Sequence, residues 1–207
     1  MTKGKFIVFE GIDGSGKSTQ AKMLADELTA LNKDVLLVQE PGGTYLANKL
    51  RSVILERPHS PEIEFFLFNA ARLSLIETVI KPNLDAGVTV ICDRYMASTI
   101  AHQGAKGLDI PIVINTMCSF VDLYPDLTIY LTADSQEAIV RKTNQSEITH
   151  FEQNGIDYLN RSSYNFDQIY NEHSIWPAMA SNYLTIQPGT VYEVYSKIKP
   201  VVFDLLK

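Results

Sequence analysis

The sequence predicts an α/β protein in which helices cover both faces of a parallel β-sheet. Five short runs of apolar and β-favouring residues recur along the chain, each followed by polar or turn residues, with helical segments between them. Such runs are typical of strands that are covered on both faces. Because strands that alternate with helices are joined by right-handed crossovers, we expect a parallel sheet and a three-layer fold.

The expected strands are, in chain order, residues 6–9, 35–38, 88–92, 127–131 and 183–186. Ligands of parallel sheets bind beyond the carboxyl ends of the strands. Functional side chains are therefore expected in the polar clusters that follow the strands, at residues 10–18, 40–44, 93–103 and from 134 onward.

The first of these clusters is a phosphate loop with the pattern G-x-x-x-x-G-K-S, between a strand and an amphipathic helix with Ala21, Leu24, Ala25 and Leu28 on one face. Glycines let backbone N–H groups turn toward phosphate oxygens, the lysine reaches the outer phosphates, and the serine hydroxyl can ligate Mg²⁺. A Gly-rich turn without a ligand is the alternative, which this strand–loop–helix context disfavours. The nucleoside triphosphate is expected on Gly11, Ile12, Asp13, Gly14, Ser15, Gly16, Lys17, Ser18 and Thr19.

The length, composition and charge of the chain limit the classes of protein to which it can belong. The 207 residues, 45% hydrophobic and 20% charged, predict one domain over residues 1–207. A net charge of −6 argues against a protein held to nucleic acid or to a membrane by bulk electrostatics. Because residues 6–9 are too short an apolar run for a signal peptide or a membrane span, we expect a cytoplasmic protein. Cys92 and Cys118 are expected to be reduced core thiols.

The segment 62–86 has the pattern of a long helix that is apolar nearly all round, which predicts burial. Arg72 follows Phe68 by one turn, so the two side chains are expected to point into a common cavity. A buried arginine needs an anionic or hydrogen-bonding partner. The alternative is a structural ion pair between Arg72 and a core carboxylate. One apolar stripe of this helix consists of Ile63, Phe66, Leu67 and Ala70.

Residues 141–167 begin with a polar stretch and are expected to be a flexible insertion, with a lid at about 141–155 that closes over the nucleotide. A mobile surface loop is the alternative. After the strand at 88–92, Asp93 is placed to organise the hydration shell of Mg²⁺, and Arg94 has a planar fork suited to a phosphate. The alternative there is a turn with solvated charges.

Together these residues resemble the thymidylate kinase family. The likeness is colinear over essentially the whole chain, and the block at 93–104 is more specific to the family than the phosphate loop. The matching segments are FEGIDGSGKST at 9–19, EPGGT at 40–44, Phe68-x-x-x-Arg72, the block DRYxxSxxAxQG at 93–104, and PDL at 125–127. The resemblance implies a five-stranded parallel sheet in a P-loop kinase fold, a homodimer, and the reaction ATP + dTMP → ADP + dTDP with Mg²⁺.

The resemblance also implies residue roles. Phe68 is expected to stack on thymine, Arg72 to bind its O4, and Thr99 and Gln103 to lie at its N3 edge. Asp13 is expected at the deoxyribose 3′-hydroxyl and Arg94 at the acceptor phosphate. The remaining substrate-binding residues expected are Glu40, Pro41, Arg51, Ser98 and His102, with Ser18 and Asp93 at the metal and Lys17, Asp93, Arg94 and Arg141 catalytic.

Three positions depart from the family pattern, and one of them is Gln39, which stands before Glu40 where arginine is frequent. Relatives supply a catalytic arginine from the phosphate loop or from the lid; because this loop carries Gly14, we expect Arg141 to supply it, with His150 and Arg161 as alternatives. His102 replaces a commonly found tyrosine at the sugar 2′ position, which predicts weaker discrimination against ribonucleotides.

Two other functions remain open: a kinase for another deoxynucleotide or for a deoxynucleoside, and a nucleotide-binding regulatory protein with weakened catalysis. Arg72 and Arg94 favour a phosphorylated pyrimidine, and the intact Lys17, Ser18 and Asp93 argue against lost catalysis.

Overall fold

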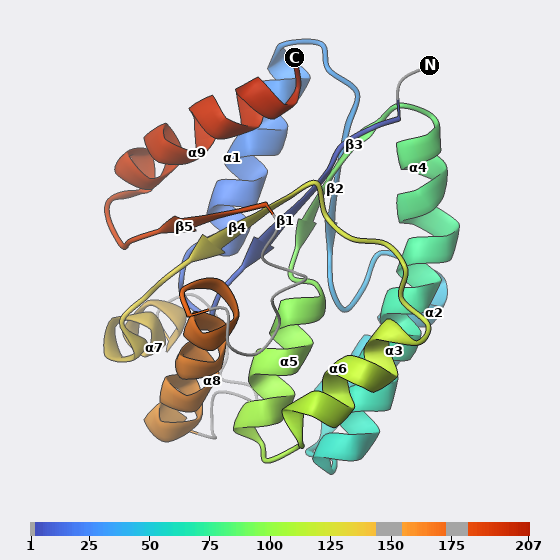
Figure 1. The fold of residues 1–207 in the computed structure, drawn as a ribbon, viewed down its shortest axis with the longest axis vertical. Helices are drawn as coiled ribbons and strands as arrows, with labels where there is room; N and C mark the ends of the chain where they lie inside the picture. Colours follow the sequence, from blue (N-terminus) through green and yellow to red (C-terminus); the bar gives the residue numbers. More distant parts are fainter. Residues whose placement is uncertain (1–2, 144–154, 173–181) are drawn as a thin grey trace.

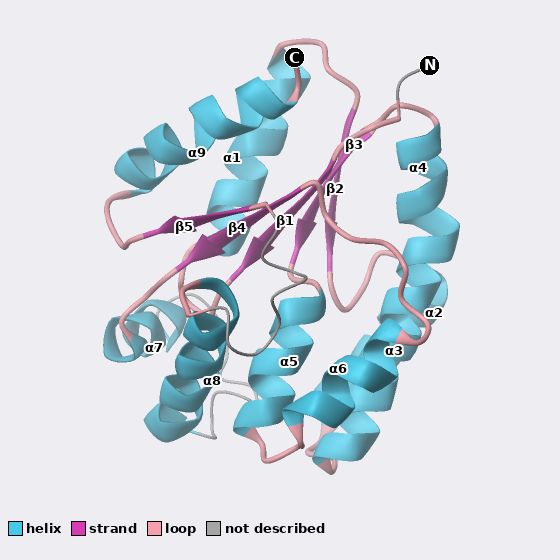
Figure 2. Cartoon of the chain, viewed as in Figure 1, coloured by secondary structure: helices cyan, strands magenta, loops and turns pink. Residues whose placement is uncertain are grey.

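The structure, a computed structural model, describes residues 3–143, 155–172 and 182–207. A five-stranded sheet lies between two layers of helices (Figures 1 and 2). The strand order is β2-β3-β1-β4-β5, and every neighbouring pair is parallel. The strands are β1 (Phe6–Glu10), β2 (Val35–Gln39), β3 (Thr89–Asp93), β4 (Leu127–Leu131) and β5 (Tyr183–Ile186). The predicted fold class is confirmed, and each expected strand is present within one residue at each end.

The described helices lie between successive strands, except α9, which follows β5. They are α1 (Lys17–Ala30), α2 (Tyr45–Glu56), α3 (Pro61–Leu75), the π-helical turn η1 (Ile76–Ile80), α4 (Lys81–Asp85), α5 (Met96–Ala105), α6 (Ile110–Cys118), α7 (Ser135–Thr143), α8 (Gly155–Tyr170) and α9 (Val191–Leu205). Side-chain oxygens of Thr44, Ser60, Asp109 and Thr190 cap the amino ends of α2, α3, α6 and α9.

Alternation along the strands divides the core between the two faces of the sheet. Ile7 and Phe9 of β1 pack with α1 and α9, whereas Phe6 and Val8 lie in a second cluster with α3, α5 and α8. Figure 1 shows α1 and α9 on one side of the sheet and α5 and α8 on the other. Strand β1 is therefore buried along its whole length, and the loop after it emerges at the centre of the sheet.

The segment 62–86 differs from the single buried helix that its pattern predicts. It consists of α3, η1 and α4, and one stripe of α3 faces outward: Ile63 is 50% exposed and Phe66 62% exposed. The predicted all-round burial is wrong for this stripe. Helix α3 packs against α2 and α5, and Ile63 and Phe66 lie on its exposed side.

The polar region 141–167 is also more ordered than expected. Arg141 lies in α7, and residues 155–167 belong to α8, which packs against α5 through buried residues such as Tyr158 and Phe166. The insertion predicted over 155–167 is therefore wrong, because buried residues spaced at helical intervals hold α8 on the core. Residues 144–154, the greater part of the predicted lid, lie outside the described residues.

Two further expectations concern the cysteines and membrane spans. Cys92 is buried, Cys118 is half-buried, and both are free thiols, as predicted. Among the described residues, no helix is both long enough and apolar enough to cross a membrane.

Candidate active site

The phosphate loop joins β1 to α1 at the carboxyl edge of the sheet. Helix α1 begins at Lys17, whose ammonium group donates to the carbonyl of Ile12 at 2.7 Å. Burial and the nearby Arg94 lower the pKa of Lys17 to about 8, so the side chain is mostly protonated at neutral pH. Lys17 is thus held at the amino end of a helix, where an anion is favoured.

Gly14 is required by the packing of the loop. Its φ is 79°, and a Cβ atom there would lie 2.1 Å from the carbonyl oxygen of Ala138 in α7. A larger residue, arginine included, would have to displace α7. The structure therefore gives a physical reason why the loop itself carries no arginine at this position.

Ser18 and Asp93 come together although 75 residues separate them. The Ser18 hydroxyl donates to Asp93 Oδ2 at 2.5 Å. The other oxygen, Oδ1, is buried and has no hydrogen-bond partner within the described ranges. A hydroxyl and a buried carboxylate with a free acceptor fit hydrated Mg²⁺ beside phosphate oxygens. The described residues contain no cluster of three or more His, Cys, Asp or Glu side chains that could hold a metal without such phosphates.

Arg94 contacts three polar side chains of the site. Its φ is 73°, and its guanidinium group donates to Asp13 at 2.6 Å, to Ser98 at 3.3 Å and to His102 Nε2 at 3.2 Å. The side chain is 16% exposed. The alternative of a strand-end turn with solvated charges is wrong, because Arg94 is held between the phosphate loop and α5.

The contacts of His102 determine its tautomer. Because a guanidinium group only donates, Nε2 must accept, and Nδ1 must carry the proton that is donated to the Tyr158 hydroxyl oxygen at 3.0 Å. Burial and Arg94 lower the pKa of His102 to about 3. The ring is therefore neutral at physiological pH and links Arg94 to α8.

Arg72 forms the ion pair that the sequence left as an alternative, and it also borders a cavity. Its Nε and Nη2 atoms donate to the Glu40 carboxylate at 2.7–3.2 Å, and Nη2 also donates to Thr99. Nη1 donates to Asn69. Burial raises the pKa of Glu40, and the contact with Arg72 opposes that rise. Because Glu40 and Arg72 both border this cavity, the ion pair is part of the predicted substrate-binding site.

Glu10, the last residue of β1, anchors the helix that carries the site. Its buried carboxylate accepts from the backbone N–H groups of Tyr95 and Ser98 and from the Ser98 hydroxyl. The amino end of α5 is thereby capped by a neighbouring strand. No role for Glu10 was predicted from the sequence, although an acidic residue at a buried strand end is a recognisable signal.

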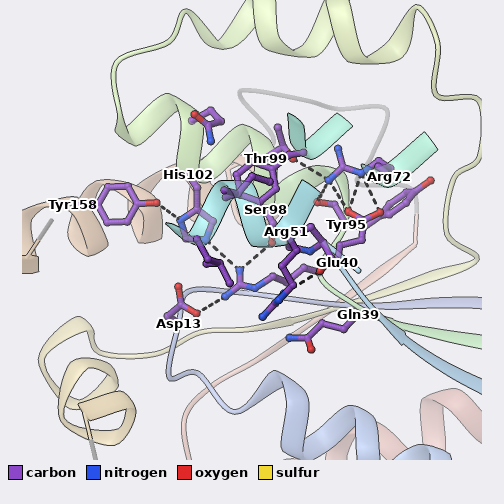
Figure 3. A pocket seen from close by; sticks show the side chains of 16 residues that line it. Asp13, Gln39, Glu40, Arg51, Arg72, Tyr95, Ser98, Thr99, His102 and Tyr158 are labelled. Carbon is purple, nitrogen blue, oxygen red and sulfur yellow. Dashed lines mark hydrogen bonds and ion pairs between the residues drawn. The ribbon is translucent and has the colours of Figure 1, made fainter. Parts of the chain in front are cut away.

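Two adjoining cavities occupy the carboxyl edge of the sheet, and Figure 3 shows the first. The first, of about 190 Å³, is bordered by all eleven predicted substrate-binding residues. The second, of about 370 Å³, is bordered by residues 13–20 and 189–191, and by Val194 and Arg141. Gly11, Ile12 and Asp93 do not border either cavity. Asp93 lies behind Ser18, which borders the second cavity and donates a hydrogen bond to it. The cavities share Asp13, Gln39 and Arg94.

A family model described as thymidylate kinase matches residues 9–185. The chain belongs to the thymidylate kinase family. It is 42% identical over 165 residues to the thymidylate kinase of Chlorobium luteolum, with 77% of each chain covered. With that of Prochlorococcus marinus it shares 35% identity over 211 residues, which cover 97% of this chain and 98% of the relative. The crystal structure of thymidylate kinase from Ehrlichia chaffeensis superposes with a TM-score of 0.77 at 29% identity, covering 97% of this chain and 98% of that chain.

Several residues that border the two cavities of this thymidylate kinase were not predicted as site residues from the sequence. Gln39, noted in the sequence only as a departure from the family pattern, lies directly before Glu40 at a strand end and borders both cavities. Tyr158 was hidden in a segment interpreted as an insertion. The loop 189–191, before α9, borders the phosphate-loop cavity and carried no motif.

Proposed function

We propose that this kinase transfers the γ-phosphoryl group of ATP to dTMP, with ATP on the phosphate loop and dTMP in the cavity bordered by Phe68 and Arg72. The observation that carries the proposal is that the two cavities meet at Asp13, Gln39 and Arg94. A donor phosphate in one cavity and an acceptor phosphate in the other would face each other at that junction.

The donor side is proposed to hold ATP through backbone N–H groups of residues 13–19 and through Lys17. When bound, Mg²⁺ would offset negative charge on the outer phosphates, with Ser18 as a ligand and Asp93 holding its water shell. The loop 189–191 borders the same cavity beyond the phosphate loop, and it is the proposed contact for the adenosine part of ATP.

The acceptor side supplies one group for each part of dTMP. Phe68 offers an aromatic face to the base, and Arg72, one turn along α3, offers N–H donors to O4. Asp13 is the proposed partner of the 3′-hydroxyl. Arg94, with Arg51 beside it, is the proposed partner of the phosphate; Arg51 is oriented by its donation to the Pro41 carbonyl at 2.9 Å.

Glu40, Pro41, Ser98, Thr99, His102 and Gln103 complete the proposed acceptor site. The acceptor oxygen of dTMP is already anionic, so positioning and charge stabilisation are the work left to the protein. Arg94 would hold the acceptor phosphate in line with the donor at the shared junction.

Arg141 is the proposed source of the second cation. It borders the phosphate-loop cavity from α7, and its side chain is 43% exposed in an ion pair with Glu137 at 3.0 Å. An exposed pair of this kind is weak, so the guanidinium group can exchange Glu137 for a phosphate at small cost. Arg161, an alternative, donates instead to the Ala105 carbonyl. His150 lies outside the described residues.

The test is ADP release measured with dTMP, dUMP, dCMP, dGMP, UMP and thymidine as acceptors, with Mg²⁺ and with chelator. We expect the highest kcat/KM with dTMP, little transfer to thymidine, and loss of transfer in chelator. A preference for thymidine or for a purine monophosphate would contradict the proposed acceptor site. Transfer that is unaffected by chelator would contradict the metal role of Ser18 and Asp93.

We also propose that the enzyme is a cytoplasmic homodimer whose protomers, each one domain over 1–207, pair through the outward stripe of α3. Ile63, Phe66 and Ala70 leave an apolar strip exposed there, and Val53 of α2 is 42% exposed. Phe66→Glu is expected to give a monomer in sedimentation velocity, because it would bury a charge in the pair. The control is Tyr164→Glu, at a 62% exposed aromatic residue on α8, which should remain dimeric. A dimeric Phe66→Glu variant would refute this surface.

A further inference from the structure

Gln103 borders the acceptor cavity, and of the two polar atoms of its amide group only the nitrogen has a hydrogen-bond partner among the described residues. Its Nε2 atom donates to Glu64 Oε2 at 3.2 Å. Its carbonyl oxygen is buried and has no hydrogen-bond partner among the residues that the structure describes. Buried acceptors are rarely left without a donor, so this oxygen calls for a donor from a ligand or from water.

The orientation of that amide group is determined by the residue behind it. An amide has a donor end and an acceptor end of nearly the same shape, and its neighbours decide which end points where. An ionised carboxylate only accepts. Because Glu64 is 1% exposed and adjoins Gln103, the NH₂ end must face Glu64 and the carbonyl oxygen must point elsewhere.

Lys106 forms an ion pair with Glu64. Its ammonium group donates to the same Oε2 atom at 2.5 Å, and the Lys106 side chain is only 13% exposed. The Lys106 ammonium group and the Gln103 NH₂ group therefore donate to one carboxylate oxygen, and the carboxylate accepts from both.

The three residues are placed by two helices that wall the cavity. Glu64 lies one turn before Phe68 on α3, and Lys106 follows Gln103 by three residues at the end of α5. Helices α3 and α5 pack against each other, so the ion pair joins them beside the cavity that Phe68 and Gln103 both border.

We propose that Glu64 and Lys106 are positioning residues that fix the carbonyl of Gln103 toward N3 of the base and so make the site reject cytosine. This inference rests on the proposed binding of dTMP in the first cavity. Thymine carries a hydrogen on N3 and can donate to this oxygen. Cytosine has a lone pair on N3, so two acceptors would meet in a buried site, which penalises binding.

The test is the ratio of kcat/KM for dTMP to kcat/KM for dCMP in Glu64→Gln. The neutral amide keeps the shape of Glu64 but can donate, so Gln103 can turn. We expect the ratio to fall about tenfold or more, mainly through a higher KM for dTMP, with the KM for ATP little changed. The thermal unfolding midpoint should fall, because Lys106 loses its charged partner. Glu62→Gln, at an exposed acid on the same helix, is the control and should keep the ratio of the unmodified enzyme.

Lys106 gives a second, independent measurement. Lys106→Met should lower the ratio in the same direction, and Lys106→Arg, which keeps the charge, should restore it. If Glu64→Gln does not fold, this pair decides the question. A folded Glu64→Gln variant with an unchanged ratio overturns the proposal, and so does an unchanged ratio in Lys106→Met when Glu64→Gln cannot be measured.

Gln103→Leu separates this inference from the proposed function. If Gln103→Leu lowers the ratio but Glu64→Gln does not, the contact with the base stands and the positioning role fails. If neither variant changes the ratio while dTMP is still phosphorylated, the Gln103 contact itself is wrong. If the unmodified enzyme does not prefer dTMP, the proposed function has failed first.

Discussion

His102 is expected to make the protein less stable as the pH falls below neutrality. Its pKa is about 3 in the folded protein, against an ordinary value of 6.5 for a histidine in water, so the unfolded chain takes up a proton that the folded chain refuses. Above pH 6.5, His102 is neutral in both the folded and the unfolded protein and does not change the free energy of unfolding. Between pH 6.5 and pH 3, each decrease in pH lowers the free energy of unfolding. The cause is burial together with Arg94, whose N–H would oppose a second donor at 3.2 Å.

The magnitude can be worked from these two pKa values. Between pH 7 and pH 5, His102 alone should remove about 2 kcal/mol from the free energy of unfolding. The negative charge of Asp13 raises the pKa of His102 and the positive charge of Lys106 lowers it, and the pKa of about 3 already includes both effects. Carboxylates also titrate in this range, so the effect must be taken as a difference between two proteins.

The assay is urea unfolding of the unmodified protein and of His102→Gln at pH 7 and pH 5. The glutamine can still accept from Arg94 but does not titrate, so the variant should lose about 2 kcal/mol less over the interval. His59→Gln, in the loop between α2 and α3, is the histidine control and should follow the unmodified protein. Equal losses in the unmodified protein and in His102→Gln would refute the reasoning.

Three further predictions concern catalysis and binding. Lys17→Ala should abolish detectable ADP release while circular dichroism stays unchanged, and near-normal turnover would exclude Lys17 from the phosphate site. Arg72→Ala should raise the KM for dTMP and leave the KM for ATP unchanged. It should also destabilise the fold by about 3–5 kcal/mol, because Glu40 stays buried without its partner. A normal KM for dTMP in this variant would mean that Arg72 has a structural role only. Arg141→Ala should lower kcat by on the order of 10³ with small changes in KM, and a retained kcat would move the second cation to another residue.

Features that depend on short stretches of chain could be predicted from the sequence. The strands follow from local runs of apolar residues, and the phosphate loop from eight contiguous residues between a strand and a helix. The positions of Glu40 and Asp93 followed as well, because they come directly after predicted strands of one parallel sheet and such ends share one edge. Local pattern and the α/β connection rules were sufficient for these.

The packing of the helices and the sheet determined which polar side chains meet. Arg94 and Asp13 are 81 residues apart, and Gln103 and Glu64 are 39 apart. It also decided that Phe66 faces outward and that Tyr158 lies in a buried helix face. Helical periodicity gives the faces of a helix but does not say which face a neighbour covers. That depends on how distant helices pack, and the same packing sets the donors, acceptors and burial that give His102 its tautomer and Gln103 its direction.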